Sequence, residues 1–379
     1  MNKETSAARP PQANAPQVKI LRAQGRNPAG GKFPLVIGAV KKTGIKFLPS
    51  GKLDPKLLER LLKRYALPGR DVIIGPSVGV DCAAVRFGGK ILLAKTDPIT
   101  FVAEDIGFYA IHINCNDIAV TGGSPRWFLA AILLPGGKTT ARLVQRIFSE
   151  LSEACKAVGA ALIGGHTEIT HGIDRAIVIG QMLGECEEKN LRSSKGAEAG
   201  DDLILTKGIA IEAVSVIARA KRGELEKAFS KAFIDRCAGF MKNPGISIVK
   251  DVEIALNNGK VKAMHDPTEG GLSMGLYELA VASGAGLAVE KDSIPVIPEA
   301  DTLLRHFNLD PMGAMASGAL LAAVDRRDTK RIIKAMSDSG IKCSRIGRVT
   351  DKRHGIKIIE NGKKKNLKVY RRDELTRLF

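Results

Sequence analysis

Hydrophobic positions recur along residues 50–350 with two different periods, which predict helices and strands in alternation. Residues 55–65 carry leucines at 57, 58, 61 and 62, which is the spacing of one helix face. Asp54 before Pro55 is a typical helix start, because the carboxylate caps the first turn and proline fits the first helical position. Similar patterns predict helices over 106–120, 140–158, 211–220, 225–240 and 271–282.

Short apolar runs between these segments predict β-strands over 72–74, 83–87, 91–94, 128–134, 161–163, 177–183, 202–206 and 318–324. Gly88-Gly89 separates two of these runs and predicts a hairpin turn, and Asn361-Gly362 predicts another. Because strands and helices alternate in both halves, the chain is predicted to have an α/β (α+β) fold.

Breaks in composition divide the chain into four parts. Residues 1–45 form a basic arm rich in Pro, Ala, Gln and Gly, which has too little apolar surface to offset its ordering entropy and is expected to be mobile. The charged stretch 185–200 predicts a domain boundary. We therefore expect an N-terminal domain over 46–190, a C-terminal domain over 196–350 and a basic tail over 351–379.

The net charge of +18 is concentrated near the two ends. Residues 1–50 hold nine Lys and Arg against one acid, and residues 326–379 hold eighteen against six. The middle of the chain holds 31 basic and 33 acidic residues. This distribution argues against a nucleic-acid-binding core. It suggests instead that the basic ends meet an anionic nucleotide or an acidic protein partner.

Length and composition exclude other classes of protein. The 379 residues suit two domains. The longest charge-free stretch, 311–324, is shorter than the roughly 20 apolar residues of a membrane helix. Residues 1–17 lack the apolar core of a secretory signal. Six scattered cysteines without a CxxC pair indicate reduced thiols. The sequence therefore predicts a cytoplasmic protein without a membrane anchor.

Acidic residues recur at turn positions beside the ends of predicted strands and helices, several of them with glycines nearby. They are Asp81, Asp97, Asp117, Glu168 and Asp266, with Asn116 next to the third. Carboxylates on such loops suit Mg²⁺ held together with polyphosphate. Asp and Gly are also the ordinary residues of turns, so each motif alone fits a structural turn equally well. Five such motifs in one chain favour a binding site.

The order of these motifs resembles the PurM-like ATP-binding superfamily, which includes AIR synthase, thiamine-monophosphate kinase, selenophosphate synthetase and HypE. The HypE branch is the most similar. The resemblance covers roughly residues 50–350 and lies in GVDCAAV (79–85), KTDPI (95–99), INCNDIAVTGGSPRW (113–127), IGGHTEIT (163–170), GQMLGE (180–185) and MHDPTEGGL (264–272).

This resemblance implies a two-domain PurM-like architecture, with an N-terminal domain that forms a homodimer through its sheet and a C-terminal α/β sandwich domain. It implies ATP and Mg²⁺ as cofactors. The residues implied to bind ATP are Asp81, Thr96, Asp97, Asn116, Asp117, Gly164, Gly165, His166, Thr167 and Asp266. Those implied to bind Mg²⁺ are Asp81, Asp97, Asp117 and Glu168.

The implied activity is ATP-dependent phosphorylation of an amide, carbamoyl or related oxygen, as in hydrogenase maturation. Two alternatives stay open: a non-catalytic nucleotide-binding assembly protein, and a small-molecule kinase like thiamine-monophosphate kinase. The chain departs from HypE proteins in two places. It ends in Thr376-Arg377-Leu378-Phe379, without their terminal cysteine, and it has Glu269 where they carry Arg. The absence of a cysteine before Cys82 disfavours the selenophosphate synthetase branch.

Overall fold

The computed structural model describes residues 48, 51–67, 69–100, 104–370 and 372–379. Chain contacts separate Met1–Pro49 from a second unit, Ser50–Phe379, which holds both sheets and every element described below. The predicted mobile arm over 1–45 lies outside the described residues. Among the described residues, no helix combines the length and apolarity needed to cross a membrane.

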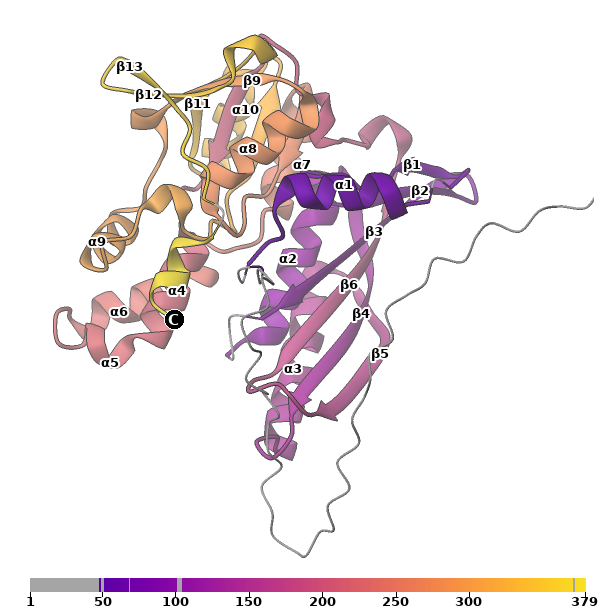
Figure 1. Cartoon of the computed structure of the whole chain (residues 1–379), viewed down its shortest axis with the longest axis vertical. Coiled ribbons are helices and arrows are strands. Elements are labelled where there is room, and N and C mark those ends of the chain that lie inside the picture. Colours follow the sequence, from indigo (N-terminus) through magenta and orange to yellow (C-terminus); the bar gives the residue numbers. More distant parts are fainter. Residues whose placement is uncertain (1–47, 49–50, 68, 101–103, 371) are drawn as a thin grey trace, which may run out of the picture. The chain divides into compact units, whose positions relative to one another are not determined.

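A six-stranded sheet forms the N-terminal half, with the helix α1 (Pro55–Tyr65) preceding it in sequence (Figure 1). Its spatial order is β1-β2-β3-β6-β4-β5, and only β4 and β5 run parallel. The strands are β1 (Val72–Ile74), β2 (Ala83–Phe87), β3 (Lys90–Ile99), β4 (Ser124–Pro135), β5 (Ala161–Thr170) and β6 (Ile177–Cys186). Two helices, α2 (Ile106–Val120) and α3 (Ala141–Val158), pack together and contact this sheet.

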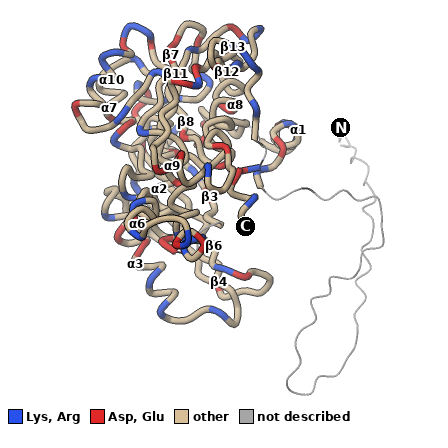
Figure 2. Tube along the Cα trace, turned by 90° about the vertical axis from the view of Figure 1, so that its left-hand side faces the viewer, with Lys and Arg blue, Asp and Glu red and all other residues tan. Residues whose placement is uncertain are grey.

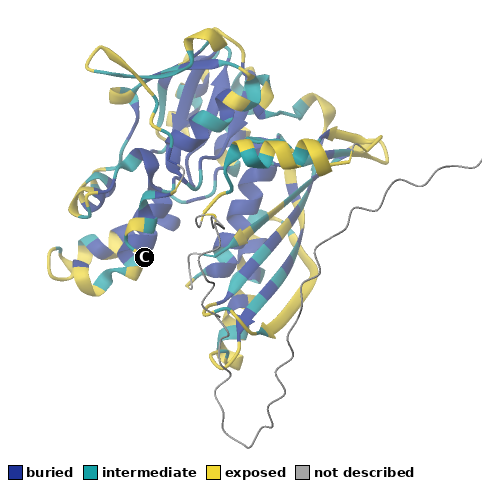
Figure 3. Ribbon diagram, in the orientation of Figure 1, coloured by how far each residue is buried: buried dark blue, intermediate teal, exposed yellow. Residues whose placement is uncertain are grey.

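The two faces of this sheet differ in burial. Along β3, β4 and β6, residues that point toward α2 are mostly buried and the alternate residues are partly exposed (Figure 3). Helix α2 is enclosed almost completely, since fourteen of its fifteen residues are buried. The edge strand β5 is exposed along nearly its whole length. One sheet face therefore forms the core with α2, and the other is an accessible surface.

Local signals explain where the helices begin and end. The carboxylate of Asp54 accepts hydrogen bonds from the amides of Lys56 and Leu57 at 3.1 Å each, which caps α1 before Pro55. The hydroxyl of Thr140 caps α3 in the same way. Gly159 ends α3 with a φ of 69°, in the left-handed region that favours glycine.

A seven-stranded sheet forms the C-terminal half, in the order β13-β12-β9-β11-β7-β10-β8. Only β9 and β12 are parallel. The strands are β7 (Asp202–Thr206), β8 (Val261–His265), β9 (Gly286–Glu290), β10 (Leu321–Val324), β11 (Cys343–Thr350), β12 (Ile356–Glu360) and β13 (Lys363–Asn366). The helices are α4 (Ile211–Ala220), α5 (Arg222–Leu225), α6 (Lys231–Ala238), α7 (Val249–Asn258), α8 (Gly271–Ser283), α9 (Pro298–His306) and α10 (Thr329–Asp338).

Both faces of this second sheet are covered. Leu203 and Leu205 of β7 pack in a cluster with residues of α8, whereas Ile204 packs in another with residues of α7 and α10. This arrangement explains why the sequence of β7 is continuously apolar from 203 to 205. Basic and acidic positions are interspersed over the described chain rather than divided between two sides (Figure 2).

The junction between the two halves is built on α2. The amide nitrogen of Asn116 donates to the carbonyl of Ile246 at 2.8 Å, and its oxygen accepts from the amide of Ile248 at 3.0 Å. Ala119 and Val120 at the end of α2 belong to the apolar cluster of the C-terminal sheet. The same helix is thus part of both cores, and it brings its polar residues to the junction.

Residues 367–370 and 372–379 fold back onto the C-terminal half. The carboxylate of Asp373 accepts from the amide of Gly270 at 2.8 Å, and Leu375 is buried beside residues of α4 and α9. The hairpin predicted at Asn361-Gly362 is confirmed by β12 and β13. The region expected to be a basic tail therefore includes two strands and a segment that contacts the start of α8.

Three element predictions are corrected by the structure. The helix predicted over 225–240 is divided, because the Ser230 hydroxyl caps a new helix, α6, and residues 239–241 form a separate 3-10 turn. Strands β3 and β5 are longer than predicted, because their pairing with β6 and β4 continues through the polar residues. Asp97 and Glu168 therefore lie in β3 and β5 rather than in turns, and Asp117 lies in α2, within the helix predicted over 106–120.

Candidate functional site

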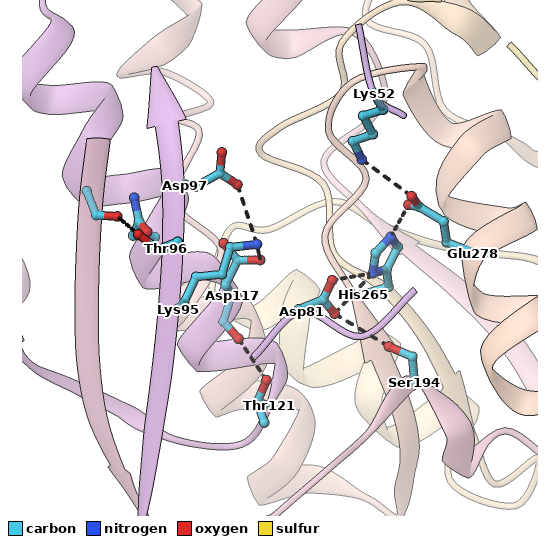
Figure 4. A network of polar contacts seen from close by, with 12 residues as sticks. Lys52, Asp81, Lys95, Thr96, Asp97, Asp117, Thr121, Ser194, His265 and Glu278 are labelled. Atoms are coloured by element: carbon cyan, nitrogen blue, oxygen red, sulfur yellow. Dashed lines mark hydrogen bonds and ion pairs between the residues drawn. The ribbon is translucent and has the colours of Figure 1, made fainter. Parts of the chain in front are cut away.

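Four carboxylates from both halves of the molecule gather at the junction. Asp97 belongs to β3, Asp117 to α2, and Asp81 lies just before β2. Asp266 follows β8 in the C-terminal sheet. Figure 4 shows the first three of these residues around two basic side chains. The predicted motifs at these four positions therefore meet in space, although they are up to 185 residues apart in the sequence.

Lys95 links two of the carboxylates. Its ammonium lies 3.0 Å from Oδ1 of Asp117 and 3.4 Å from Oδ2 of Asp97. Burial alone would lower the pKa of Lys95, but Asp117 and Asp97 raise it well above its usual value. Burial raises the pKa of Asp117 well above its usual range, although Lys95 opposes this change. Lys95 therefore carries a proton at neutral pH and stabilises the negative charge around it.

His265 links the rest of the cluster to α8. Its Nδ1 lies 3.0 Å from Oδ1 of Asp81, and its Nε2 lies 3.0 Å from Oε2 of Glu278. Lys52 reaches the other oxygen of Glu278 at 3.4 Å. Burial opposes the charged forms, but the ion pairs outweigh it: the pKa of His265 is well above its usual value, and that of Glu278 is lowered to about 2. With an acceptor at each nitrogen, His265 is an imidazolium that donates on both sides.

Unpartnered oxygens make this cluster suitable for a cation. Oδ2 of Asp117 and Oδ2 of Asp266 are buried without a hydrogen-bond partner. Burial raises the pKa of Asp266 to about 7, with Asp81 adding to the effect. Side-chain ligand atoms of Asp81, His265 and Asp266 lie within 4.8 Å of one another. Since both nitrogens of His265 already bind carboxylates, the available ligands are carboxylate oxygens, which is the donor type that Mg²⁺ prefers.

A glycine places Asp81 against the C-terminal half. Gly79 has a φ of +75°, and a Cβ at this position would lie 2.5 Å from the carbonyl oxygen of Glu278. Only glycine combines this conformation with such a close approach. The Gly79-Val80-Asp81 motif therefore packs directly on α8, and Asp81 reaches His265.

Two predicted ligands have other contacts in the structure. Side chains alternate along β3, so Lys95 and Asp97 share the α2 face and Thr96 points to the opposite face. The hydroxyl of Thr96 donates to the carbonyl of Gly180 at 2.8 Å. Both polar atoms of Asn116 are used in its bonds to Ile246 and Ile248. Asn116 therefore holds the two halves together beside the cluster.

The GGHTE segment of β5 lies apart from the carboxylate cluster. Asp97 pairs with Gly180, Gly180 with Ala130, and Ala130 with Gly165, so three strand spacings separate Asp97 from Gly165, or about 14 Å. His166 is the next residue along β5 and pairs with Ala131, so its side chain points to the sheet face opposite the one that carries Asp97.

The exposed side chains of His166 and Glu168 approach each other at 3.6 Å. Within one chain, the structure does not bring Gly164, Gly165, His166, Thr167 and Glu168 to the other predicted ligands.

Several residues of the cluster carried no sequence-based prediction. Lys95 was recoverable, because it stands two residues before Asp97 in a strand and must share its face. The other members come from separate elements: Lys52 lies before α1, Glu278 lies in α8, and Glu269 lies in the turn before α8. Single acidic or basic residues in such places have no distinctive spacing, so only the fold shows that they belong together.

We expect Asp373→Asn to reduce stability by about 1–2 kcal/mol. The two carboxylate oxygens accept from the amides of Gly270 at 2.8 Å and Leu375 at 2.9 Å, whereas a carboxamide offers only one acceptor. Burial raises the pKa of Asp373 to about 6. The folded state thus binds the proton more tightly than the unfolded chain, and this contribution to stability is lost as the pH rises from about 4 through 6.

Urea unfolding of the wild type and Asp373→Asn at pH 5 and 7 measures both effects. Asp351→Asn is the control, since Asp351 is exposed and accepts only from the amide of Arg353 in its own turn. Equal stability of wild type and Asp373→Asn at both pH values would show that the bond to Gly270 has no structural importance.

Comparison with known proteins places this geometry in a family. The N-terminal domain of AIR synthase related proteins matches residues 79–186, and their C-terminal domain matches residues 198–360. The chain is 26% identical over 318 residues to a putative hydrogenase expression/formation protein of Methanocaldococcus jannaschii, covering 80% of this chain and 91% of that protein. It is also 26% identical over 288 residues to the carbamoyl dehydratase HypE of Cupriavidus necator, covering 73% and 78% respectively.

Solved structures show the same architecture. The hydrogenase maturation protein HypE in complex with ATP superposes with a TM-score of 0.63 at 20% identity, covering 82% of this chain and 90% of that one. The predicted two-domain PurM-like fold is thereby confirmed. Because the two family domains follow each other across most of the chain and contain most strands of both sheets, this protein belongs to the AIR synthase related family.

Proposed function

We propose that the protein is a Mg²⁺- and ATP-dependent enzyme that phosphorylates an amide, carbamoyl or related oxygen. The observation that carries this proposal is the meeting of Asp81, Asp97, Asp117 and Asp266 at the junction of the two halves. ATP binding by a HypE of the same fold supports it. Two related proteins are described as a hydrogenase expression/formation protein and a carbamoyl dehydratase, which supports a role in metalloenzyme maturation.

The donor set fits Mg²⁺ better than a softer metal. The four aspartates supply oxygen ligands, two of them with a buried unpartnered oxygen, and no cysteine is needed. Asp81, Asp97, Asp117 and Asp266 would hold the ion. Bound there, Mg²⁺ would neutralise phosphate charge and orient the transferred group.

The basic residues of the cluster would orient the carboxylates and the nucleotide. Lys95 holds Asp97 and Asp117 in place, and His265 holds Asp81. The Lys52 side chain is 41% exposed, so its ammonium is accessible to a phosphate while it stays near Glu278. Phosphoryl transfer requires positioning and charge stabilisation more than a covalent nucleophile. These residues supply both.

Turnover measurements test this proposal. We expect the full-length protein to form ADP from ATP and Mg²⁺ faster when a carbamoyl or primary amide acceptor is added. Asp266→Asn should reduce this rate at least a hundredfold, because it removes a charged ligand from the C-terminal half. Tight ATP binding without ADP formation, whether a carbamoyl or a primary amide acceptor is added, would favour the non-catalytic assembly protein. Absence of ATP binding would contradict both functions.

We further propose that a second copy of the chain covers the exposed face of the N-terminal sheet. Leu129, Leu133, Ile179 and Leu183 alternate with buried residues and are partly exposed on this face. His166 and Glu168 of β5 lie on the same face. Pairing of two such faces would bury these side chains and bring the GGHTE segment into the interface.

Ile179→Glu tests this dimer, since Ile179 lies in the middle of β6 on the exposed face. We expect sedimentation velocity to show a dimer for the wild type and a monomer for the variant, because a charge in an apolar interface has no partner. Val281→Glu, at an exposed position of α8 in the C-terminal half, is the control and should remain dimeric. A wild type that sediments as a monomer at high concentration would contradict the proposed interface.

A further inference from the structure

Glu212 is a buried carboxylate that the proposed phosphoryl-transfer site does not use. It lies in the first turn of α4 and is 5% exposed. Its Oε2 has no hydrogen-bond partner, and none of the Lys, Arg or His side chains in the described part of the chain forms an ion pair with it. An unpaired acid in the interior is costly. A chain that needed only packing at this position would be more stable with an apolar residue.

Two unpartnered hydroxyl groups lie in the same neighbourhood. Ser317 is fully buried, its hydroxyl lies beside the Glu212 carboxyl, and neither group has a hydrogen bond of good geometry. Tyr109 of α2 is 1% exposed, and its hydroxyl is also without such a bond. The negative charge of Glu212 acts on Tyr109 and raises its pKa, after the larger effect of burial. Three polar groups from three segments thus lack partners in one region.

The charges around Glu212 are acidic. Burial raises the pKa of Glu212 to about 7, with the Ser317 hydroxyl opposing this change and the charges of Asp373, Asp97 and Glu269 adding to it. Arg219 of α4, whose charge acts on Tyr109, is already paired with Asp105, and Lys95 is already paired with Asp97 and Asp117. The region therefore repels anions and favours a positively charged group that donates hydrogen bonds.

We propose that Glu212, Ser317 and Tyr109 form the acceptor-substrate subsite and bind a small molecule through a cationic nitrogen group, a guanidinium or an ammonium. This inference rests on the function proposed above. Ile99 ends the strand that carries Asp97 and packs against one apolar cluster with Tyr109 and with Ile211 and Ala213, which flank Glu212, so the subsite adjoins the place where the phosphoryl group would be transferred. The N–H groups of the ligand would donate to the carboxylate of Glu212, and the hydroxyl oxygens of Ser317 and Tyr109 would accept further hydrogen bonds from the ligand.

Saturation-transfer NMR on the full-length protein tests this subsite, with methylguanidinium chloride and ethylammonium chloride as probes. We expect at least one probe to bind the wild type with a millimolar dissociation constant in NaCl of fixed ionic strength. Glu212→Gln should weaken that binding at least tenfold. Glu299→Gln should not change it, because Glu299 occupies the first turn of α9 and pairs there with Arg236.

The outcomes separate this inference from the proposed function. Failure of both probes to bind the wild type, or equal binding by Glu212→Gln, overturns the subsite even where Mg²⁺ and ATP bind normally. Competition by MgCl₂ alone at the same ionic strength would show a metal site and would also overturn it. If Glu212→Gln does not fold, Ser317→Ala takes its place with the same expected direction. ATP binding is measured in a separate titration, and its absence contradicts only the proposed function.

Discussion

Replacement of Lys95 by methionine is expected to lower the free energy of unfolding by about 3 kcal/mol and to weaken ATP binding at least tenfold. Methionine keeps the apolar stem but removes the charge that lies 3.0 Å from Asp117 and 3.4 Å from Asp97. Asp117 is only 5% exposed at its side chain, so water cannot replace the lost partner. Urea unfolding and an ATP titration measure the two effects.

Lys207→Met is the matched control for Lys95→Met. Lys207 is also a buried lysine, and its ammonium lies 3.2 Å from Asp251 and donates to the carbonyl of Ser247. It belongs to the C-terminal half and contacts no residue of the carboxylate cluster. We expect a similar loss of stability with unchanged ATP affinity. If Lys95→Met retained the ATP affinity of the wild type, Lys95 would have only a structural role.

The second large effect is expected from Asp81→Ala combined with Asp117→Ala. The pair removes one carboxylate before β2 and one from α2, and we expect ATP affinity in the presence of Mg²⁺ to fall at least a hundredfold, which corresponds to about 2.7 kcal/mol. Without Mg²⁺ the loss should be much smaller, because removing negative charge also reduces repulsion of the phosphates. Calorimetric titration with and without Mg²⁺ measures the difference.

Asp301→Ala combined with Asp338→Ala is the control for this double variant. Both residues lie on helix surfaces in pairs with Arg305 and Lys334. The net charge changes by the same amount, but the carboxylate cluster is untouched. A double variant at Asp81 and Asp117 that binds ATP as tightly as this control would show that the cluster is not the metal site.

The sequence predicted much of the fold because its signals are local. The helices over 55–65, 106–120 and 211–220 and the strand over 202–206 have the predicted boundaries. Caps such as Asp54 and Thr140 act within one turn, so they are readable without the fold. The helix predicted over 225–240 was wrong, since tertiary packing and the cap at Ser230 outweighed a continuous pattern.

The candidate site was predictable only in part. Asp81, Asp97, Asp117 and Asp266 were identified from their motifs, and the structure places them together. The expected turn position was wrong for Asp97, because β3 continues through its polar residues, whereas Asp117 lies in α2, the helix predicted over 106–120. Assignment of the GGHTE segment to this site stays a prediction that depends on a second copy.

Contacts across the junction could not be predicted from one sequence. Lys52 and Glu278 are 226 residues apart, and Glu212 is recognised only by its lack of a partner in the folded molecule. The net charge of +18 belongs mainly to the ends of the sequence and did not locate the site, since the cluster at the junction is predominantly acidic. The contacts across the junction and the acidic character of the cluster both depend on which distant residues the fold brings together.

Binding of ATP through Mg²⁺ at the carboxylate cluster is tested by calorimetric titration of ATP into the full-length protein, once in MgCl₂ and once in EDTA at equal ionic strength. We expect saturable binding with Mg²⁺ and at least a hundredfold weaker binding in EDTA, because the acidic cluster repels the free nucleotide. Equal affinity in both solutions, or no binding in either, would contradict this mode of binding.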